Sequence, residues 1–313
     1  MDDNKIKLLD GSYGFQLNKH LEKPVDHDPL WSSRALITDP EAVIKTHMDY
    51  IHVGVDIIET NTYQASIEGF MQYLNISKEE SYKLIQKAVD LARMAVDQCE
   101  KKGYKRPLIA GSVGPYGAYL HDGSEYTGTY IQHVSEDTLR QFHEPRIDAL
   151  IKSKVDLLAI ETIPSKKEAL VILDVVRKYP DIKAWVSFSC KSDGVHTNAG
   201  DNFSEAAVEV YESDPAQIVA VGVNCIAPHA VEPLIQPINQ ARDKPIPLIV
   251  YANSGENYDP KTGWDNNCEK LEEYIPTWLN LGVKIIGGCC RVCANYIEKI
   301  KDEVDKWEAQ RNK

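Results

Sequence analysis

Three cysteines occupy positions from which they could bind one metal ion. Cys289 and Cys290 are adjacent and follow an apolar run through two glycines, and Cys225 follows another apolar run. Adjacent cysteines do not readily form a disulfide with each other, whereas both can face one ion if the chain turns there. Zinc held by three protein ligands keeps a fourth position open for water or substrate, which is typical of catalytic sites. The pattern therefore predicts an open three-thiolate zinc site for thiol chemistry.

Carboxylates directly follow other apolar runs. Asp10, Glu59 and Glu161 each occupy such a position. Burying a carboxylate without a partner is costly, and a cationic substrate amine would offset that cost. Asp10 and Glu161 could instead form a hydrogen-bonded helix cap or an internal ion pair, and Glu59 could orient loops without touching substrate. These residues are candidates for binding an amine.

Polar groups beside these residues complete a candidate substrate site. Ser112 lies in the glycine-rich turn 111–114, whose backbone N–H groups could hold a carboxylate. Asn224 precedes Cys225 and could donate a hydrogen bond to a metal-bound sulfur. A plain turn role would also explain both positions. The residues expected at the substrate are Asp10, Gly11, Glu59, Ser112, Glu161 and Asn224.

Eight short apolar runs rich in Val, Ile and Leu recur along the chain, as expected of buried parallel strands. They lie at 6–9, 55–58, 107–110, 155–160, 184–188, 218–223, 247–250 and 283–286. Stretches with the apolar spacing of helices, such as 82–92 and 168–176, separate them. Eight strand-then-helix units predict a (β/α)₈ TIM barrel of the α/β class, with residues 1–313 in a single domain.

The carboxyl ends of the strands form the active-site face of such a barrel. Cys225 would follow the sixth strand, and Cys289 and Cys290 the eighth, so one strand separates them. The segments 18–40 and 116–134 are long enough to form extra structure over the mouth. Loops near this face carry tyrosines whose rings could surround a sulfonium group, namely Tyr13, Tyr63, Tyr116, Tyr119, Tyr126 and Tyr130.

Composition favours small-molecule substrates. The 313 residues include 35 Lys and Arg against 47 Asp and Glu, and the formal net charge of −12 would repel nucleic acid and anionic lipid. The start of the chain lacks the pattern of a signal peptide, and no apolar run approaches membrane-spanning length. Seven cysteines without the dense spacing of a secreted scaffold favour reduced thiols. We therefore expect a cytoplasmic protein without nucleic-acid or membrane partners.

The order of these motifs resembles the homocysteine S-methyltransferase family over nearly the whole chain. The motifs are Leu9-Asp10-Gly11, Glu59-Thr60-Asn61-Thr62, Gly111-Ser112-Val113-Gly114-Pro115, Glu161-Thr162, Gly222-Val223-Asn224-Cys225, Tyr251-Ala252-Asn253-Ser254-Gly255-Glu256 and Gly287-Gly288-Cys289-Cys290. The resemblance implies a zinc-containing (β/α)₈ barrel with Cys225, Cys289 and Cys290 as ligands and homocysteine sulfur as the fourth. It also implies that Asp10 and Glu161 bind the homocysteine ammonium group. The chain departs from the family at Ala252, where members usually have proline, and at Val292-Cys293, which replaces small polar residues.

The expected reaction is methyl transfer from a sulfonium donor, S-methylmethionine or S-adenosylmethionine, to the thiolate of L-homocysteine, which gives methionine. The chain lacks the long C-terminal extension with which betaine-dependent relatives oligomerise, and this favours sulfonium donors and a monomer. Selenium acceptors fit the same chemistry. One alternative is a zinc hydrolase on the same barrel, although hydrolases more often use histidine and carboxylate ligands. The other is a non-catalytic barrel whose structural zinc takes Cys293 as fourth ligand.

Overall fold

Eight parallel strands form the centre of the protein. The computed structural model describes residues 5–25, 28–256, 258–259, 263–265 and 267–311. The strand order is β1-β10-β7-β6-β5-β4-β3-β2, and a parallel bridge between Leu9 and Ile57 joins the two ends of the sheet. The strands are β1 Lys7–Leu8, β2 Ile57–Glu59, β3 Leu108–Val113, β4 Leu157–Ile163, β5 Lys183–Phe188, β6 Ile218–Asn224, β7 Leu248–Ala252 and β10 Val283–Gly288. The predicted α/β barrel is confirmed.

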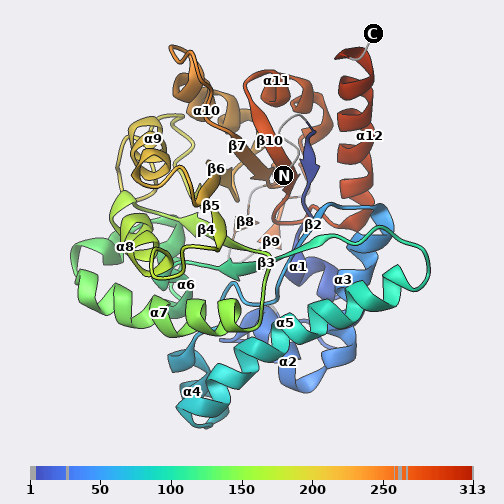
Figure 1. The fold of residues 1–313 in the computed structure, drawn as a ribbon, viewed down its shortest axis with the longest axis vertical. Helices are drawn as coiled ribbons and strands as arrows, with labels where there is room; N and C mark the ends of the chain where they lie inside the picture. The colour runs from blue at the N-terminus through green and yellow to red at the C-terminus, as the bar shows by residue number, and fades with distance from the viewer. Residues whose placement is uncertain (1–4, 26–27, 257, 260–262, 266, 312–313) are drawn as a thin grey trace.

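Helices cover the outside of this barrel. They are α1 Tyr13–Leu17, α2 Ala35–Thr38, α3 Pro40–Val53, α4 Ile67–Leu74, α5 Lys78–Glu100, α6 Tyr116–Leu120, α7 Glu136–Lys152, α8 Lys166–Val176, α9 Phe203–Ser213, α10 Val231–Asn239, α11 Ile275–Asn280 and α12 Ala294–Arg311. Figure 1 shows the strands in the centre, with α3, α5 and α7 to α12 arranged around them. Among the described residues, no helix has the length and apolarity needed to cross a membrane.

Polar caps fix where several of these helices begin. At the start of α5, the Ser77 hydroxyl accepts a hydrogen bond from the Glu80 backbone N–H, and the Glu80 carboxylate accepts one from the Ser77 backbone N–H. This reciprocal pair satisfies two backbone donors that a helix start leaves free. Ser135 and Ser165 cap α7 and α8 in a simpler way, each through its side-chain oxygen.

Side chains fill the barrel interior and form a floor beneath the mouth. The interior cluster combines the bulky Trp185 and Tyr251 with the small Ala110, Ala159 and Ala220. Large side chains beside small ones allow facing strands to pack without voids. Trp185 Nε1 donates to the Tyr251 hydroxyl at 3.2 Å. The Tyr251 hydroxyl also hydrogen-bonds the Ser187 hydroxyl, which links this floor to the side chain of Asn224.

Short helices occupy the two long segments near the mouth, as the sequence indicates. The segment 18–40 contains the 3-10 helix η1 Trp31–Arg34, and the segment 116–134 contains α6, η2 Ser124–Tyr126 and η3 Thr129–Gln132. Two further 3-10 helices are η4 Pro228–Ala230 and η5 Leu271–Glu273. The small antiparallel pair β8 Tyr258–Asp259 and β9 Gly263–Trp264 follows β7 and was not predicted.

A buried arginine on α7 holds the loops that follow β2 and β3. The Arg146 guanidinium donates to the carbonyl oxygens of Gly114 at 3.0 Å, Thr62 at 3.1 Å and Tyr63 at 2.8 Å. Burial lowers the pKa of Arg146 to about 10, so the side chain still carries its charge at neutral pH. One outer helix thus sets the position of two mouth loops.

Arg146→Met should lower the free energy of unfolding by about 3 kcal/mol or more, because three buried carbonyls lose their donor at about 1–3 kcal/mol each. Urea denaturation measures this change. Arg140→Met is the matched control on the same helix, since Arg140 makes only a 3.5 Å ion pair with Asp174 at the surface. Such pairs contribute less than about 1 kcal/mol. Equal losses in the two variants would contradict a role for Arg146 in holding the loops.

Candidate metal centre and substrate site

Three thiols meet at the carboxyl ends of β6 and β10. The Sγ atoms of Cys225, Cys289 and Cys290 all lie within 4.8 Å of one another, and those of Cys225 and Cys290 are 3.4 Å apart. The backbone is left-handed at Cys225, with φ of 54°, and at Arg291, with φ of 66°. Non-glycine residues seldom adopt this conformation, and it concentrates at functional sites. The chain turns sharply at both places, and the predicted trio comes together.

The chemistry of these thiols fits a bound metal ion. Hydrogen bonds from Cys289 and Cys290 hold the pKa of the Cys225 thiol well below its usual range, and the same bonds to Cys225 raise the pKa of both donors. The Cys225 thiol therefore ionises more readily than the thiols of Cys289 and Cys290. A divalent ion would stabilise all three as thiolates, and sulfur-rich sets select soft metals such as zinc. Three ligands leave one position of a tetrahedral ion open.

The loop after β7 braces the two adjacent cysteines. Asn253 Oδ1 accepts from the Cys290 backbone N–H at 3.1 Å, and the Asn253 side chain also hydrogen-bonds Cys225. The Glu256 carboxylate accepts from the Ser254 hydroxyl and from Arg291 Nε, both at 2.5 Å. The sequence indicates this loop as a polar segment after the seventh apolar run and as part of a family motif, but it assigns Asn253 no role.

Asn224 differs from its expected role as a donor to sulfur. Its Oδ1 accepts from the Thr162 backbone N–H at 2.8 Å and from the Ser187 hydroxyl at 2.9 Å, and its Nδ2 donates to Thr162 Oγ1 at 2.8 Å. Thr162 has a left-handed φ of 59°, which is unusual for a β-branched residue. Asn224 therefore holds the turn that carries Glu161, and the amide that reaches sulfur belongs to Asn253.

The predicted carboxylates converge beside the thiols. Asp10 Oδ2 accepts from the Glu59 backbone N–H at 2.8 Å, and the Ser112 hydroxyl donates to Glu161. Burial and mutual repulsion raise the pKa of Asp10 and Glu59 well above their usual values. Burial raises the pKa of Glu161 to about 7, and the charge of Cys225 adds to this effect. Asp10 Oδ1 and Glu59 Oε1 are buried without a hydrogen-bond partner. These two oxygens can accept hydrogen bonds from a cationic ligand.

Gly11, which was expected at the substrate, has a packing role in the structure. A Cβ atom at this position would lie 2.2 Å from the Val292 backbone oxygen. Only glycine permits this approach between the end of β1 and the turn that carries Cys289 and Cys290. Gly11 thus brings the turn close to Asp10.

Cys293 lies outside the metal-competent group of the described residues. It is buried immediately before α12, and its carbonyl oxygen accepts from the backbone N–H groups of Tyr296 and Ile297. Burial raises the pKa of its thiol, although the positive charge of Lys19 lowers this pKa in part. The alternative of a closed four-thiolate zinc site with Cys293 is therefore not favoured, because this thiol lies outside the group and hydrogen-bonds the Lys19 side chain instead.

One of the expected tyrosines reaches the thiols. The Tyr126 hydroxyl in η2 lies 3.2 Å from Cys225 Sγ.

The segment around Tyr126 is anchored by Glu168 of α8, a fully buried carboxylate that the sequence analysis did not identify. Glu168 accepts from the Tyr116 backbone N–H at 2.7 Å, from the Tyr130 hydroxyl, and from His143 Nε2 at 2.9 Å. Tyr116 and Tyr130 are thus anchors of this segment.

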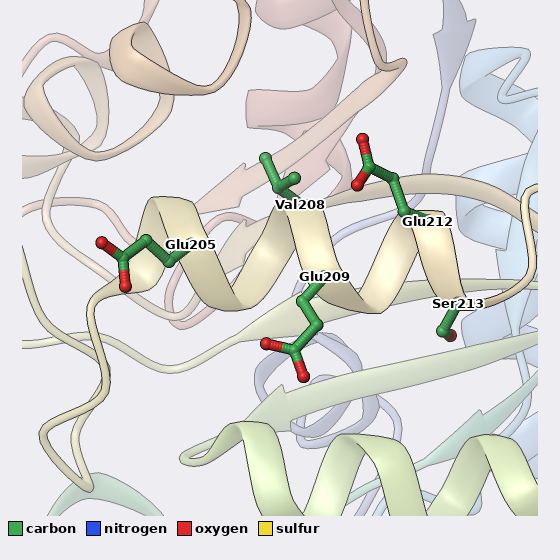
Figure 2. A pocket seen from close by; sticks show the side chains of 5 residues that line it. All are labelled: Glu205, Val208, Glu209, Glu212 and Ser213. Atoms are coloured by element: carbon green, nitrogen blue, oxygen red, sulfur yellow. The ribbon is translucent and has the colours of Figure 1, made fainter.

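A separate surface hollow on α9 has a different character. Figure 2 shows its lining by Glu205, Val208, Glu209, Glu212 and Ser213, all from one helix. Two of these carboxylates already form ion pairs, Glu209 with Lys166 at 2.7 Å and Glu212 with Arg242 at 2.8 Å. The hollow lies on the outer helical layer and is not the candidate active site.

The pKa of Glu161 predicts a pH effect on stability in the metal-free protein. Glu161 binds its proton more tightly when folded, with a pKa of about 7, than at its ordinary value of 4.5. Its contribution to the free energy of unfolding is therefore fully present below about pH 4.5 and lost as the pH rises to about 7. Relative to Glu161→Gln, the wild type should lose stability across this interval, as measured by urea denaturation at each pH. A pH-independent difference between the two proteins would contradict the raised pKa.

Comparisons with known proteins identify the family of this chain. The family described as homocysteine S-methyltransferase matches residues 7–304. A betaine-homocysteine S-methyltransferase from Drosophila melanogaster is 44% identical over 317 aligned residues, which cover 97% of this chain and 96% of that protein. The homocysteine S-methyltransferase YbgG from Bacillus subtilis is 39% identical, with 96% and 95% covered. The metallated form of the homocysteine methyltransferase MmuM from Escherichia coli superposes with a TM-score of 0.84 at 36% identity, with 96% and 97% covered. The chain belongs to the homocysteine S-methyltransferase family.

Proposed function

We propose that this protein is a zinc-dependent enzyme that transfers a methyl group from a sulfonium donor, S-methylmethionine or S-adenosylmethionine, to L-homocysteine. One observation carries the proposal: a three-thiol group lies beside buried carboxylates, two of which have oxygens without a hydrogen-bond partner. The thiols suit a sulfur-binding metal, and the carboxylates suit an amine. Homocysteine is a small molecule that offers both a thiol and an ammonium group.

The carboxylates would bind the homocysteine ammonium group. Asp10 and Glu59 each offer an unpartnered buried oxygen, and Glu161 is held beside them by Ser112. A cation among them restores the ionised state that burial disfavours, because attraction to the ammonium group offsets desolvation and mutual repulsion. The site is therefore complete only with a cationic ligand.

Cys225, Cys289 and Cys290 would hold the zinc ion, which when bound keeps the homocysteine thiol deprotonated at neutral pH. The protein contributes the positions of these ligands. Asn253 hydrogen-bonds Cys225 and the Cys290 backbone, and Glu256 holds Arg291 beyond the pair. Hydrogen bonds of this kind orient metal ligands and moderate their charge.

The reaction needs no general acid or base from the protein. A sulfur lone pair of homocysteine forms a bond to the donor methyl carbon while the bond from that carbon to the sulfonium sulfur breaks. The donor leaves as a neutral thioether, and no proton moves in this step. Holding the two sulfur atoms and the methyl carbon in line supplies much of the rate, since aligned reactants avoid an entropic cost of about 7–11 kcal/mol.

The hydrolase alternative has less support. The metal-competent group among the described residues contains three cysteines and neither histidine nor carboxylate. Catalytic zinc hydrolases usually combine histidine and carboxylate ligands. The names of the relatives do not identify the methyl donor. The Drosophila relative is named for betaine, whereas YbgG and MmuM are named for the acceptor alone.

The zinc-loaded protein should form methionine from L-homocysteine with S-methylmethionine or S-adenosylmethionine, and Cys289→Ala should abolish turnover because the metal loses one of three ligands. Product formation, with betaine as a third donor, measures this. Chelation should likewise remove activity while the far-ultraviolet circular dichroism spectrum stays unchanged. Metal-bound protein that turns over no donor would overturn the proposed function, and unfolding on chelation would indicate a structural metal.

Asp10→Asn should raise the KM for homocysteine about 10- to 100-fold, because a hydrogen bond to a charged group contributes about 1.5–3 kcal/mol. Steady-state kinetics at saturating donor give this value. Glu205→Gln, which removes an exposed carboxylate on α9, is the control and should leave the KM unchanged. An unchanged KM for homocysteine in Asp10→Asn would remove this residue from the ammonium site.

A further inference from the structure

A carboxylate outside the site described so far has an unpartnered oxygen. Glu125 lies in η2, one residue before Tyr126, and its Oε2 atom is buried without a hydrogen-bond partner. Burial raises the pKa of this carboxyl group, and the charge of Cys225 adds to the effect. A buried acceptor without a donor is costly unless a ligand supplies one.

Glu125 marks a second acidic position near the thiols. It interacts electrostatically with Cys225 and raises the pKa of Tyr63, a residue of the loop after β2. In the homocysteine site, Glu161 raises the pKa of both Asp10 and Glu59, and the charge of Cys225 raises the pKa of Glu161. Glu125 comes from η2, where its neighbour Tyr126 places a hydroxyl 3.2 Å from Cys225 Sγ, so a further carboxylate lies close to the same sulfur.

The backbone of Glu125 is held firmly. Its carbonyl oxygen accepts from the Ser189 hydroxyl at 2.8 Å. A Cβ atom on Gly117 would lie 2.6 Å from its nitrogen, and one on Gly128 would lie 2.6 Å from Ala199 Cα, so the segment packs closely on both sides. The position is fixed before any ligand arrives, which favours a binding role.

We propose that Glu125 binds the α-ammonium group of the methyl donor and thereby selects donors that carry a primary amine over betaine. This inference rests on the proposed function, because it assigns the second substrate of the same site. S-methylmethionine and S-adenosylmethionine both have such an ammonium group. Betaine has a quaternary nitrogen that cannot donate a hydrogen bond.

The ammonium group is a better partner for Glu125 than the sulfonium centre. Methyl transfer removes the sulfonium charge, so a carboxylate beside that centre would stabilise the donor more than the transition state and would slow the reaction. The α-ammonium charge is the same before and after transfer. A carboxylate that binds it contributes uniform affinity and positions the donor, while the homocysteine ammonium already has Asp10, Glu59 and Glu161.

Glu125→Gln should raise the KM for S-methylmethionine about 10- to 100-fold, because one charge-assisted hydrogen bond is weakened. The KM for homocysteine should stay unchanged. The KM for dimethylsulfoniopropionate, a sulfonium donor without an amine, should also stay unchanged. Glu125→Asp keeps the charge and should recover part of the affinity, and Glu205→Gln on α9 is the carboxylate control. A rise in the KM for homocysteine instead, or equal rises for both sulfonium donors, would overturn the proposal.

Calorimetric binding of S-methylmethionine without homocysteine gives a readout independent of turnover. The wild type should bind this donor more tightly than Glu125→Gln by the same factor, with equal thermal stability of the two proteins. Equal affinities would overturn the role of Glu125. Absence of turnover with every donor in the wild type would instead count against the proposed function, because the binding difference is measured separately.

Discussion

The close approach of three sulfur atoms is the constraint on which the rest of the mouth depends. Cys225 and the pair Cys289 and Cys290 come from strands separated by β7 in the sheet, and their Sγ atoms lie within 4.8 Å of one another. Such proximity requires sharp turns, and the chain provides them with left-handed backbone at Cys225 and Arg291. It also requires bracing from β7, which Asn253 supplies. The intervening strand is therefore part of the site, although it contributes no thiol.

Buried carboxylates impose a second constraint, since each one resists ionisation. Asp10, Glu59 and Glu161 all have a raised pKa because they are desolvated and close together. A stability-optimised barrel would fill these positions with apolar or paired groups. Buried carboxylates with a perturbed pKa are typical of functional sites, where a bound ligand supplies the partner that the folded protein does not provide. The floor of Trp185 and Tyr251 and the anchor of Arg146 allow the barrel to tolerate them.

Much of the barrel and of the candidate site could be predicted from sequence, because barrel geometry turns a sequence pattern into a spatial one. Residues after eight apolar runs must meet on one face, which brought Cys225 beside Cys289 and placed Asp10 near Glu161. The directions of side chains could not be predicted in this way. Asn224 and Asn253 both lie at strand ends, yet the Asn253 side chain hydrogen-bonds Cys225 whereas the Asn224 side chain hydrogen-bonds Thr162. Glu125 gave no signal, since its burial depends on the packing of a loop.

The two acidic positions also bear on how product leaves. In the proposed reaction, the donor would arrive with a sulfonium, an ammonium and a carboxylate charge, and the thioether that remains would keep only the ammonium and the carboxylate, which cancel. Beside the low-pKa thiol of Cys225, the loss of one positive charge would weaken the electrostatic attraction of the product to the mouth. Contact with Glu125 would persist, but the long-range attraction would not. The same negative charge that would attract the proposed cationic donor would therefore favour release of its neutral product.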